Sequence, residues 1–509
     1  MNKQMLTLPK ISLLLFLCLG FFACDEDEFL TRVPDGRFTP SNFYETPRHI
    51  EEANNALYRQ MRGLNIGRLY QYGEYRSDNT TFEFDLNDRG RTGIEEIDYF
   101  LMNTDNGFLG GFYNDLYNSI ARTNYIIAQV GDVPFEDADL KLAREAEARF
   151  FRGYLYFLAV QHYGNIPLVL EPLQDGGESL IRLRQSGPDE IYQQVVLPDL
   201  QFAIDNLPVR WSNAETGRVT QGAALMGLAR AHFARREYAA ALPLLDAIVE
   251  SGEYQLQNTY ADVFRVDNNS EIIYAGQFDA GANQGAGFML SWLPESGTDI
   301  TDGPARNQGG FNIPTCSLLE AYEEGDLRKA FTIGFYDTPF NNPELDSIPY
   351  SRKFLEVPFP TGGVGIDIDF PIMRYADVLL MQAEARLETE GGLPNSVFET
   401  LNGLRARAGL PFYFPGNPVP ELDLRTEEDL RQAIRRERRV ELAYENSRTY
   451  DLIRYGTYVE TMLAHGEEQK GKQSFLDDFP EAYTNIRILL AIPPNEVELY
   501  GYTQNPGWE

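Results

Sequence analysis

The chain contains few of the residues on which metal and thiol chemistry depend. Among 509 residues there are three cysteines, four histidines and three tryptophans. So few imidazole groups leave little material for a zinc site, and Cys316 has no histidine near it in the sequence that could activate it as a nucleophile. A phosphate-binding glycine loop and the nucleophile elbow of a hydrolase are both missing. We therefore predict neither a metal site nor a cofactor.

Positive charge is also scarce. Lysine and arginine together number 44 against 76 aspartates and glutamates, which gives a formal net charge of −32. Such a chain repels phosphate backbones, so nucleic-acid binding is disfavoured. Hydrophobic residues make up 43% of the chain and aromatic residues 13%. This composition is ample for a core and compatible with ring surfaces that stack on sugars.

An apolar run near the N-terminus, residues 11–22, is short for a membrane span. Ala23 stands directly before Cys24, as in a lipoprotein signal whose cysteine is lipidated after cleavage. We predict a signal peptide at residues 1–23 and a lipid anchor on Cys24. The alternative is a secretory signal followed by an incidental cysteine. Cleavage removes Cys18 and lipidation occupies Cys24, which leaves no pair for an intramolecular disulfide.

Acidic residues and then prolines follow the predicted anchor. The acids are Asp25, Glu26, Asp27 and Glu28, which by themselves predict a solvated leader. Residues 24–42 include prolines at positions 34 and 40, and we expect them to form an extended tether.

Helical periodicity dominates the rest of the chain. We expect helices at residues 43–62, 108–130, 140–163, 188–206, 220–250 with a break at 235–237, 374–388 and 396–408. The string EIIYAGQF at residues 271–278 predicts a strand instead. Tetratricopeptide spacing is matched by Ala229, Tyr238, Ala241 and Leu245. Successive helix pairs with short connections favour a repeat scaffold.

The predicted fold class is therefore mostly α, with a tetratricopeptide-like helical-repeat scaffold and a few short strands. We expect an N-terminal scaffold at residues 43–260 and scaffold helices with a closing segment at 371–509. Between them, residues 261–370 are rich in glycine, proline and asparagine, and predict an irregular, loop-rich ligand-binding region.

Residues 426–456 contain no proline and have glycine only as the last residue, so they predict one long helix capped by Thr426. Glu437 and Glu441 fall within its apolar face. A buried carboxylate is costly unless a cation satisfies it, so we expect arginine partners, such as Arg374, Arg405 or Arg407, and a structural role. The alternative is a metal or general acid/base site.

Two irregular segments are the candidate ligand-binding parts. Residues 69–79 and 281–311 both combine aromatic rings with planar polar groups, which suit the apolar faces and hydroxyl rims of sugars. Each also has a packing interpretation, as a loop on the scaffold or a hydrophobic plug. The candidate residues are Trp292, Tyr70, Tyr72, Tyr75, Arg76, Asp78, Asn79, Arg306 and Phe311.

Several strings resemble the SusD-like (RagB/SusD) family of outer-membrane nutrient-binding lipoproteins. They are EARFFRGYLYFLAVQHYGNIPL at residues 147–168, IRRERR with the acids and aromatics that follow at 434–456, and the closing segment with Ile492, Pro493, Glu496 and 504–507. The resemblance runs from Cys24 to the end of the chain. It implies that residues 25–28 form the signal for export to the outer leaflet of the outer membrane.

The resemblance further implies a lipid-anchored protein at the cell surface that binds an oligosaccharide or a peptide. A SusC-like TonB-dependent transporter would be the partner that receives the ligand. Family members bind without turnover, so no catalytic residue is predicted. Two alternatives stay open, because 76 acids could include the two carboxylates of a glycoside hydrolase, and a repeat scaffold could be a protein–protein adaptor.

Overall fold

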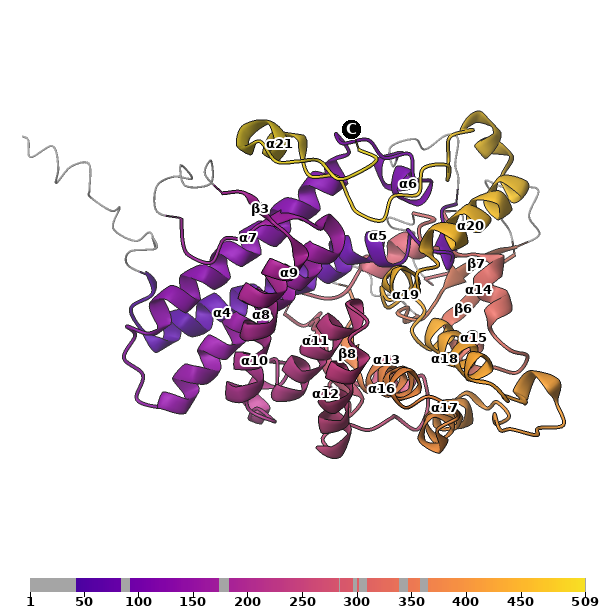
Figure 1. Ribbon diagram of the computed structural model, residues 1–509, viewed down its shortest axis with the longest axis horizontal. Coiled ribbons are helices and arrows are strands. Elements are labelled where there is room, and N and C mark those ends of the chain that lie inside the picture. The colour runs from indigo at the N-terminus through magenta and orange to yellow at the C-terminus, as the bar shows by residue number, and fades with distance from the viewer. Residues whose placement is uncertain are drawn as a thin grey trace, which may run out of the picture.

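The computed structural model describes residues 43–83, 92–173, 183–282, 284–295, 300–301, 309–337, 347–357 and 365–508. Cys24, the acids at 25–28 and Arg306 lie outside these residues. Helices predominate (Figure 1). The longer ones are α4 (Pro47–Leu64), α7 (Gly107–Val130), α8 (Ala138–Tyr163), α10 (Leu197–Asn206), α11 (Gln221–Ala234), α12 (Tyr238–Glu250), α16 (Tyr375–Glu390), α17 (Asn395–Ala408), α18 (Glu427–Glu441), α19 (Arg448–Tyr455) and α20 (Tyr458–Lys472).

Shorter elements connect them. Helices of four to seven residues are α5 (Tyr70–Gly73), α6 (Thr92–Asp98), α9 (Pro188–Ile191), α13 (Asp262–Arg265), α14 (Cys316–Ala321), α15 (Leu327–Thr332) and α21 (Pro494–Tyr500). The strands form antiparallel pairs: β1 (Thr80–Thr81) with β5 (Ile313–Pro314), β2 (Ile166–Pro167) with β3 (Gln185–Ser186), β4 (Ile272–Gly276) with β8 (Phe370–Arg374), and β6 (Ile333–Tyr336) with β7 (Ile348–Ser351).

Local signals set the starts of the long helices. Thr46 accepts a hydrogen bond from the backbone N–H of His49 before α4, and Asp137 accepts from the N–H groups of Asp139 and Leu140 at the start of α8. Thr426 and Asp429 form a capping box at α18. Each cap satisfies backbone donors that have no partner inside the helix. The helix starts could therefore be predicted from the sequence to within a few residues.

Neighbouring helices pack in a continuous array. Helix α8 packs against α7 and α10, α10 against α11, α11 against α12, and α12 against α16, which in turn packs against α17 and α18. Figure 1 shows α10, α11, α12, α16 and α17 following one another along one side of the molecule. Helix pairs far apart in the sequence thus form one scaffold, which confirms the predicted mostly helical, tetratricopeptide-like fold.

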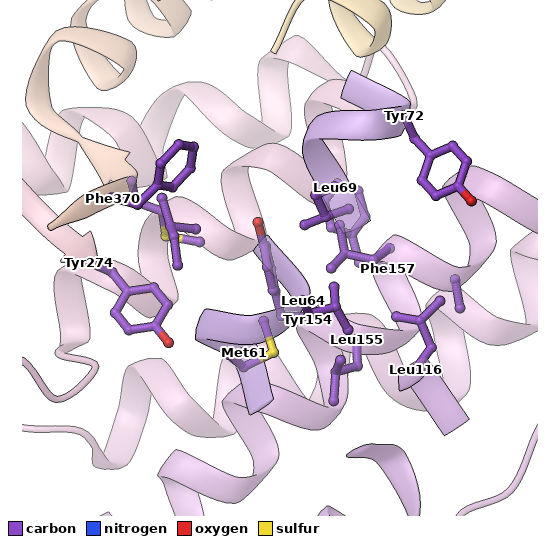
Figure 2. Packing of buried hydrophobic residues seen from close by; sticks show 14 of the residues in the cluster. Met61, Leu64, Leu69, Tyr72, Leu116, Tyr154, Leu155, Phe157, Tyr274 and Phe370 are labelled. Atoms are coloured by element: carbon purple, nitrogen blue, oxygen red, sulfur yellow. The ribbon is translucent and has the colours of Figure 1, made fainter. Parts of the chain in front are cut away.

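The main hydrophobic core lies where α4 and α8 meet the β4–β8 pair. Figure 2 shows Met61 and Leu64 of α4 close to Tyr154 of α8, with Tyr274 and Phe370 approaching from the two strands. A second, smaller apolar cluster joins α16, α17 and α18. The strand pair therefore links the irregular region to the helical scaffold through buried apolar surface, the main favourable term in folding.

The predicted single helix at residues 426–456 is wrong. Helix α18 ends at Glu441, α19 begins at Arg448, and Tyr444 (φ 66°) and Asn446 (φ 62°) between them have left-handed backbone conformations. The carbonyl of Glu441 accepts hydrogen bonds from Arg374 and Tyr260, and that of Ala443 accepts from Lys353. Side chains from elsewhere thus replace the helical N–H groups, and the chain can leave the helix without orphaned carbonyls.

Among the residues that the structure describes, no helix combines the length and the apolar character needed to span a membrane.

Candidate functional site

The two irregular segments expected to carry the ligand site do meet in space. Strand β1, which follows the first segment, pairs with β5, which follows the second, with Thr80 opposite Pro314. The backbone N–H of Glu83 donates to the carbonyl of Gly310 at 2.8 Å. Sequence positions more than 200 residues apart are thereby held at one edge of the scaffold. We call this meeting of residues 69–83 with 288–295 and 309–315 the junction.

Aromatic rings fill the junction from within. Trp292 is 1% exposed, and its ring centroid lies 5.3 Å from Phe288, 6.0 Å from Tyr70 and 6.1 Å from Tyr444. Tyr75 is fully buried. Trp292 and Tyr75 therefore have no free ring face for a sugar, which corrects the expectation that they form a stacking surface. The pair distances are those of edge-to-face packing in a core.

The other candidate rings follow the same pattern, with one exception. Tyr72 is buried against Phe112 at 4.9 Å, and Phe311 is buried against Phe82 at 5.0 Å. Tyr70 remains partly exposed. Of the four tyrosine and tryptophan candidates, Tyr70 is therefore the least buried residue.

The polar candidate residues use their hydrogen-bonding groups on partners within the chain. Asp78 accepts hydrogen bonds from Arg448 at 2.7 and 2.9 Å and lies 2.9 Å from a nitrogen of Arg439. Asn79 accepts from Arg439 at 2.8 Å, and Arg76 donates to the carbonyls of Arg487 and Ile488. Their hydrogen bonds therefore connect the junction to α18, α19 and the chain at residues 487–488. This corrects the expectation that they bond ligand hydroxyls.

The pKa values of two buried carboxyl groups at the junction shift in opposite directions. Burial would raise the pKa of Asp78, but the guanidinium groups of Arg448 and Arg439 outweigh it and hold that pKa well below its usual range. Glu74 receives only neutral donors, from the backbone of Asn446 at 3.0 Å and the amide of Asn79 at 3.3 Å. Burial therefore raises the pKa of Glu74 to about 7.

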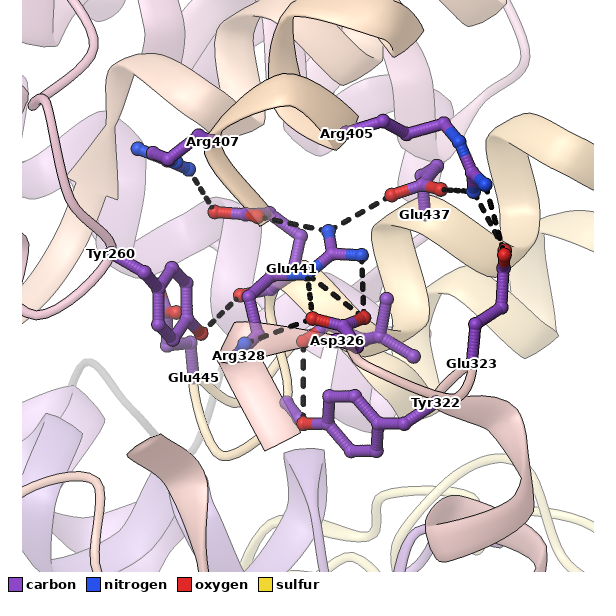
Figure 3. A network of polar contacts seen from close by, with 12 residues as sticks. Tyr260, Tyr322, Glu323, Asp326, Arg328, Arg405, Arg407, Glu437, Glu441 and Glu445 are labelled. Carbon is purple, nitrogen blue, oxygen red and sulfur yellow. Dashed lines mark hydrogen bonds and ion pairs between the residues drawn. The ribbon is translucent and has the colours of Figure 1, made fainter. Parts of the chain in front are cut away.

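The two carboxylates of α18 have the structural role predicted for them. Glu437 is 1% exposed and Glu441 is fully buried. Glu437 accepts from Arg405 and Arg328, each at 2.9 Å, and Glu441 accepts from Arg374, Arg407 and Arg328 (Figure 3). Arg374, Arg405 and Arg407 are the partners expected from the sequence.

Arg328 of α15 was not foreseen. It lies in the irregular region and bridges Glu437 and Glu441 while also pairing with Asp326 at 2.8 Å (Figure 3). Nothing in the local sequence points to the bridging role of Arg328, because the two carboxylates that it bridges lie 109 and 113 positions away. Its position could only be known from the fold.

A general acid must carry a proton near neutral pH. Although burial raises the pKa of Glu441, Arg407, Arg374 and Arg328 lower it far more, so that this carboxylate stays ionised. The described residues also contain no group of three or more histidine, cysteine, aspartate or glutamate side chains placed to hold a metal ion. The cluster therefore joins β8, α15, α17 and α18 as a buried ion-pair network.

A cavity of about 110 Å³ lies beside the junction, lined by Leu69, Tyr154, Arg230, Asp377 and Arg438 among others. Pockets for small ligands usually have volumes of about 300–1,000 Å³. Arg230 and Arg438 both pair with Asp377, so these charged groups of the cavity wall already have partners within the protein. We interpret it as a packing space between helices.

Two family models match successive parts of the chain. Residues 28–233 match a SusD-like family described as starch-binding and associating with the outer membrane, and residues 270–508 match the SusD family. A SusD-like protein of Formosa agariphila is 27% identical over 550 aligned positions, with 97% of each chain covered. A SusD-like protein of Bacteroides ovatus is 24% identical, covering 90% of this chain and 85% of its own.

Solved structures show the same fold. A laminarin binding SusD-like protein aligns with a TM-score of 0.74 at 24% identity, covering 91% of this chain and 100% of its own. Surface glycan-binding protein A from Bacteroides fluxus aligns with a TM-score of 0.71 at 21% identity, covering 91% of this chain and 100% of its own. With both halves matched by SusD-type models, and relatives aligned along nearly all of its length, the chain belongs to the SusD family.

Proposed function

We propose that this protein captures an oligosaccharide, or alternatively a peptide, at the cell surface. The observation that carries the proposal is the match of both halves of the chain to SusD-type models. Solved relatives of the same fold include one named for laminarin binding and others named as surface glycan-binding proteins. An oligosaccharide is therefore the favoured ligand class.

The proposal places the protein at the outer membrane, held by a lipid on Cys24 and exported to the outer leaflet by the acids at positions 25–28. Captured ligand would pass to a SusC-like TonB-dependent transporter. The family description of association with the outer membrane supports the location. The acidic composition, with a net charge of −32, suits a protein that works outside nucleic-acid-rich compartments.

We place the primary ligand site on the surface above the junction, with Tyr70 as the ring nearest to it. The buried rings and ion pairs beneath would hold this surface rigid, since a site built on locked side chains loses less conformational entropy on binding. Trp292, Tyr72, Tyr75, Arg76, Asp78, Asn79 and Phe311 are then supports of the site and not its contacts.

Calorimetry against a glycan panel, followed by chromatography of the mixture, tests the function. Binding without new products supports the proposal, binding with cleavage products indicates a surface glycoside hydrolase, and no binding to any glycan or peptide favours an adaptor.

The site is tested with Tyr70→Ala, which should weaken binding at least about fivefold if its ring stacks on the ligand. Tyr500→Ala on α21, also partly exposed, is the control.

A further inference from the structure

A second hollowed surface lies away from the junction, where α4 faces the loop at residues 213–218 and strand β4. It consists of two adjoining hollows of about 310 and 350 Å³. Both are lined by Thr216, Gly217, Arg218, Tyr274, Ala275 and Gln277, so they form one elongated surface. Each reaches the size usual for a ligand pocket. We call it the α4–β4 groove.

One face of α4 presents arginines to this groove. Asn55, Arg59 and Arg62 are spaced four and three residues apart, which places them on the same side of the helix. Asn55 accepts a hydrogen bond from Arg218 at 2.8 Å on the opposite wall. The groove thus has guanidinium groups on both sides.

Among the described residues, the hydrogen bonds and ring contact of Arg62 are made with neutral groups. It donates to the carbonyl of Gln277 at 2.8 Å and to the side-chain oxygen of Gln284 at 3.1 Å, and its guanidinium lies over the ring of Phe278 at 5.1 Å. A guanidinium has five N–H donors, and these two bonds leave three of them without an acceptor among the described residues. Because Arg62 is partly exposed at the groove, its remaining donors are hydrated and can exchange water for a ligand.

Arg59 is exposed and makes no hydrogen bond or ion pair within the part of the chain that the structure describes. Burial and the positive charge of Arg59 both lower the pKa of Arg62. By contrast, Arg218 and Arg210 in the same groove are paired with Glu147 and Glu253 at 2.9 and 2.7 Å. Among the residues that the structure describes, Arg59 and Arg62 thus form no ion pair, although the chain has 76 acidic residues.

The carboxylate that acts most strongly on Arg62 is that of Asp369. Asp369 accepts a hydrogen bond from the backbone of Phe278 at 2.8 Å and forms no ion pair with Arg62 within the described residues. Burial raises the pKa of Asp369 to about 6, with Asp267 and Asp367 adding to the increase. Asp369 therefore acts on Arg62 through space, without a direct contact, and its carboxylate is still largely ionised at neutral pH.

The rest of the groove offers planar amides and aromatic edges. Gln277 donates to Asn268 at 2.5 Å, and Trp211 and Tyr254 line the farther hollow. Gly217 (φ 95°) lies against the Gln277 side chain, where an added Cβ would come within 2.2 Å of it. Amides, aromatic rings and the two adjacent guanidinium groups of Arg59 and Arg62 are the components of a site for a polar ring that carries a negative charge.

We propose that the α4–β4 groove is a second saccharide site that takes an anionic oligosaccharide, bearing carboxylate or sulfate groups, with Arg59 and Arg62 binding the anionic group. The sugar part of this inference rests on the proposed function, whereas the charge preference rests on the groove alone. Bidentate pairing of arginine with a carboxylate or sulfate supplies both the attraction and the orientation.

The test is calorimetry of the full chain with three hexasaccharide classes: uronate (polygalacturonate, polymannuronate and polyguluronate), sulfated (carrageenan type) and neutral (maltohexaose and laminarihexaose). Arg59→Gln and Arg62→Gln should each weaken binding of the acidic class by on the order of tenfold, and raising salt should weaken it further. Arg48→Gln is the matched control, because Arg48 lies on the same helix, is largely exposed and pairs only with Glu52. Melting curves confirm folding.

Loss of acidic binding in both groove variants, with Arg48→Gln unchanged, supports the inference, and the uronate and sulfated arms identify which anionic group is used. Neutral glycans that bind through Tyr70 and are unaffected by the groove variants would support two separate sites. The inference is overturned if no acidic hexasaccharide binds, or if acidic binding is equal in all three variants. Failure of every glycan, neutral and acidic, would instead contradict the proposed function.

Discussion

Nη1 of Arg374 lies 2.8 Å from Oε1 of Glu441, and both side chains are buried. Arg374 ends strand β8 and Glu441 ends helix α18. Nη2 of the same arginine also donates to the carbonyl of Glu441 at 2.7 Å. A single residue pair thus joins the irregular region to the C-terminal scaffold and helps to terminate the helix.

Replacing Glu441 by alanine should lower the free energy of unfolding by roughly 3–5 kcal/mol, because Arg374, Arg407 and Arg328 would lose a buried counterion. Denaturant unfolding measures this. Glu428→Ala on the same helix is the control, since its carboxylate is 61% exposed and pairs with Arg431 at the surface, where such pairs contribute about 0–1 kcal/mol. Equal midpoints for the two variants would contradict the structural role of Glu441.

Trp292→Ala should behave as a core mutation. Loss of a large buried ring usually costs about 3–5 kcal/mol, and this ring contacts Tyr70, Phe288, Phe354 and Tyr444. We expect a markedly lower melting temperature, with a smaller decrease for Trp292→Phe. A Trp292→Ala protein that melts like the wild type but no longer binds its glycan would show that the ring contacts ligand after all.

Glu74 should make stability depend on pH. Its pKa is about 7 in the folded protein because burial raises it, against 4.5 for an exposed glutamate. The native state therefore holds a proton that the unfolded chain releases, so the contribution of Glu74 is fully present below pH 4.5 and is lost as pH rises through 7. Relative to Glu74→Gln, the wild type should lose up to roughly 3 kcal/mol between pH 4 and pH 8.

Chemical denaturation of both proteins across this pH range measures the difference. A constant offset between wild type and Glu74→Gln can come from altered hydrogen bonds to Asn79 and Asn446, so only the change with pH is diagnostic. A difference that does not vary with pH would mean that the pKa of Glu74 is the same in the folded and unfolded states.

Cys24→Ala should release the protein from the membrane. The wild type is expected in the detergent-extracted membrane fraction and the variant in the soluble fraction. Two acyl chains on a lipidated cysteine are enough for stable membrane anchoring, whereas a chain without Cys24 carries no acyl group at this position. Cys316→Ala is the control, since Cys316 is exposed and free. A Cys24→Ala protein that still fractionates with membranes would exclude the anchor at this position.

The helical scaffold, the boundaries of most of the long helices and the resemblance to the SusD-like family could be predicted from the sequence. Caps such as Thr46 and Thr426 and the apolar periodicity are local features, which act wherever the chain is placed. The need of Glu437 and Glu441 for arginine partners also followed from their place on an apolar face, because burial of an unpaired carboxylate is too costly. Arg374, Arg405 and Arg407, the partners expected from the sequence, supply the positive charge.

The three-dimensional fold was needed to locate the end of the helix after Thr426, to show that Trp292 is buried, and to find arginines that form no ion pair among the described residues. The break after Glu441 depends on Arg374, Tyr260 and Lys353, which reach its carbonyls from 67 to 181 positions away. The burial of Trp292, and the lack of an ion pair to Arg62 among the described residues, likewise depend on the groups that the fold places beside them. Local periodicity encodes which face of an element is apolar, but the groups that satisfy a buried backbone or side chain come from distant segments.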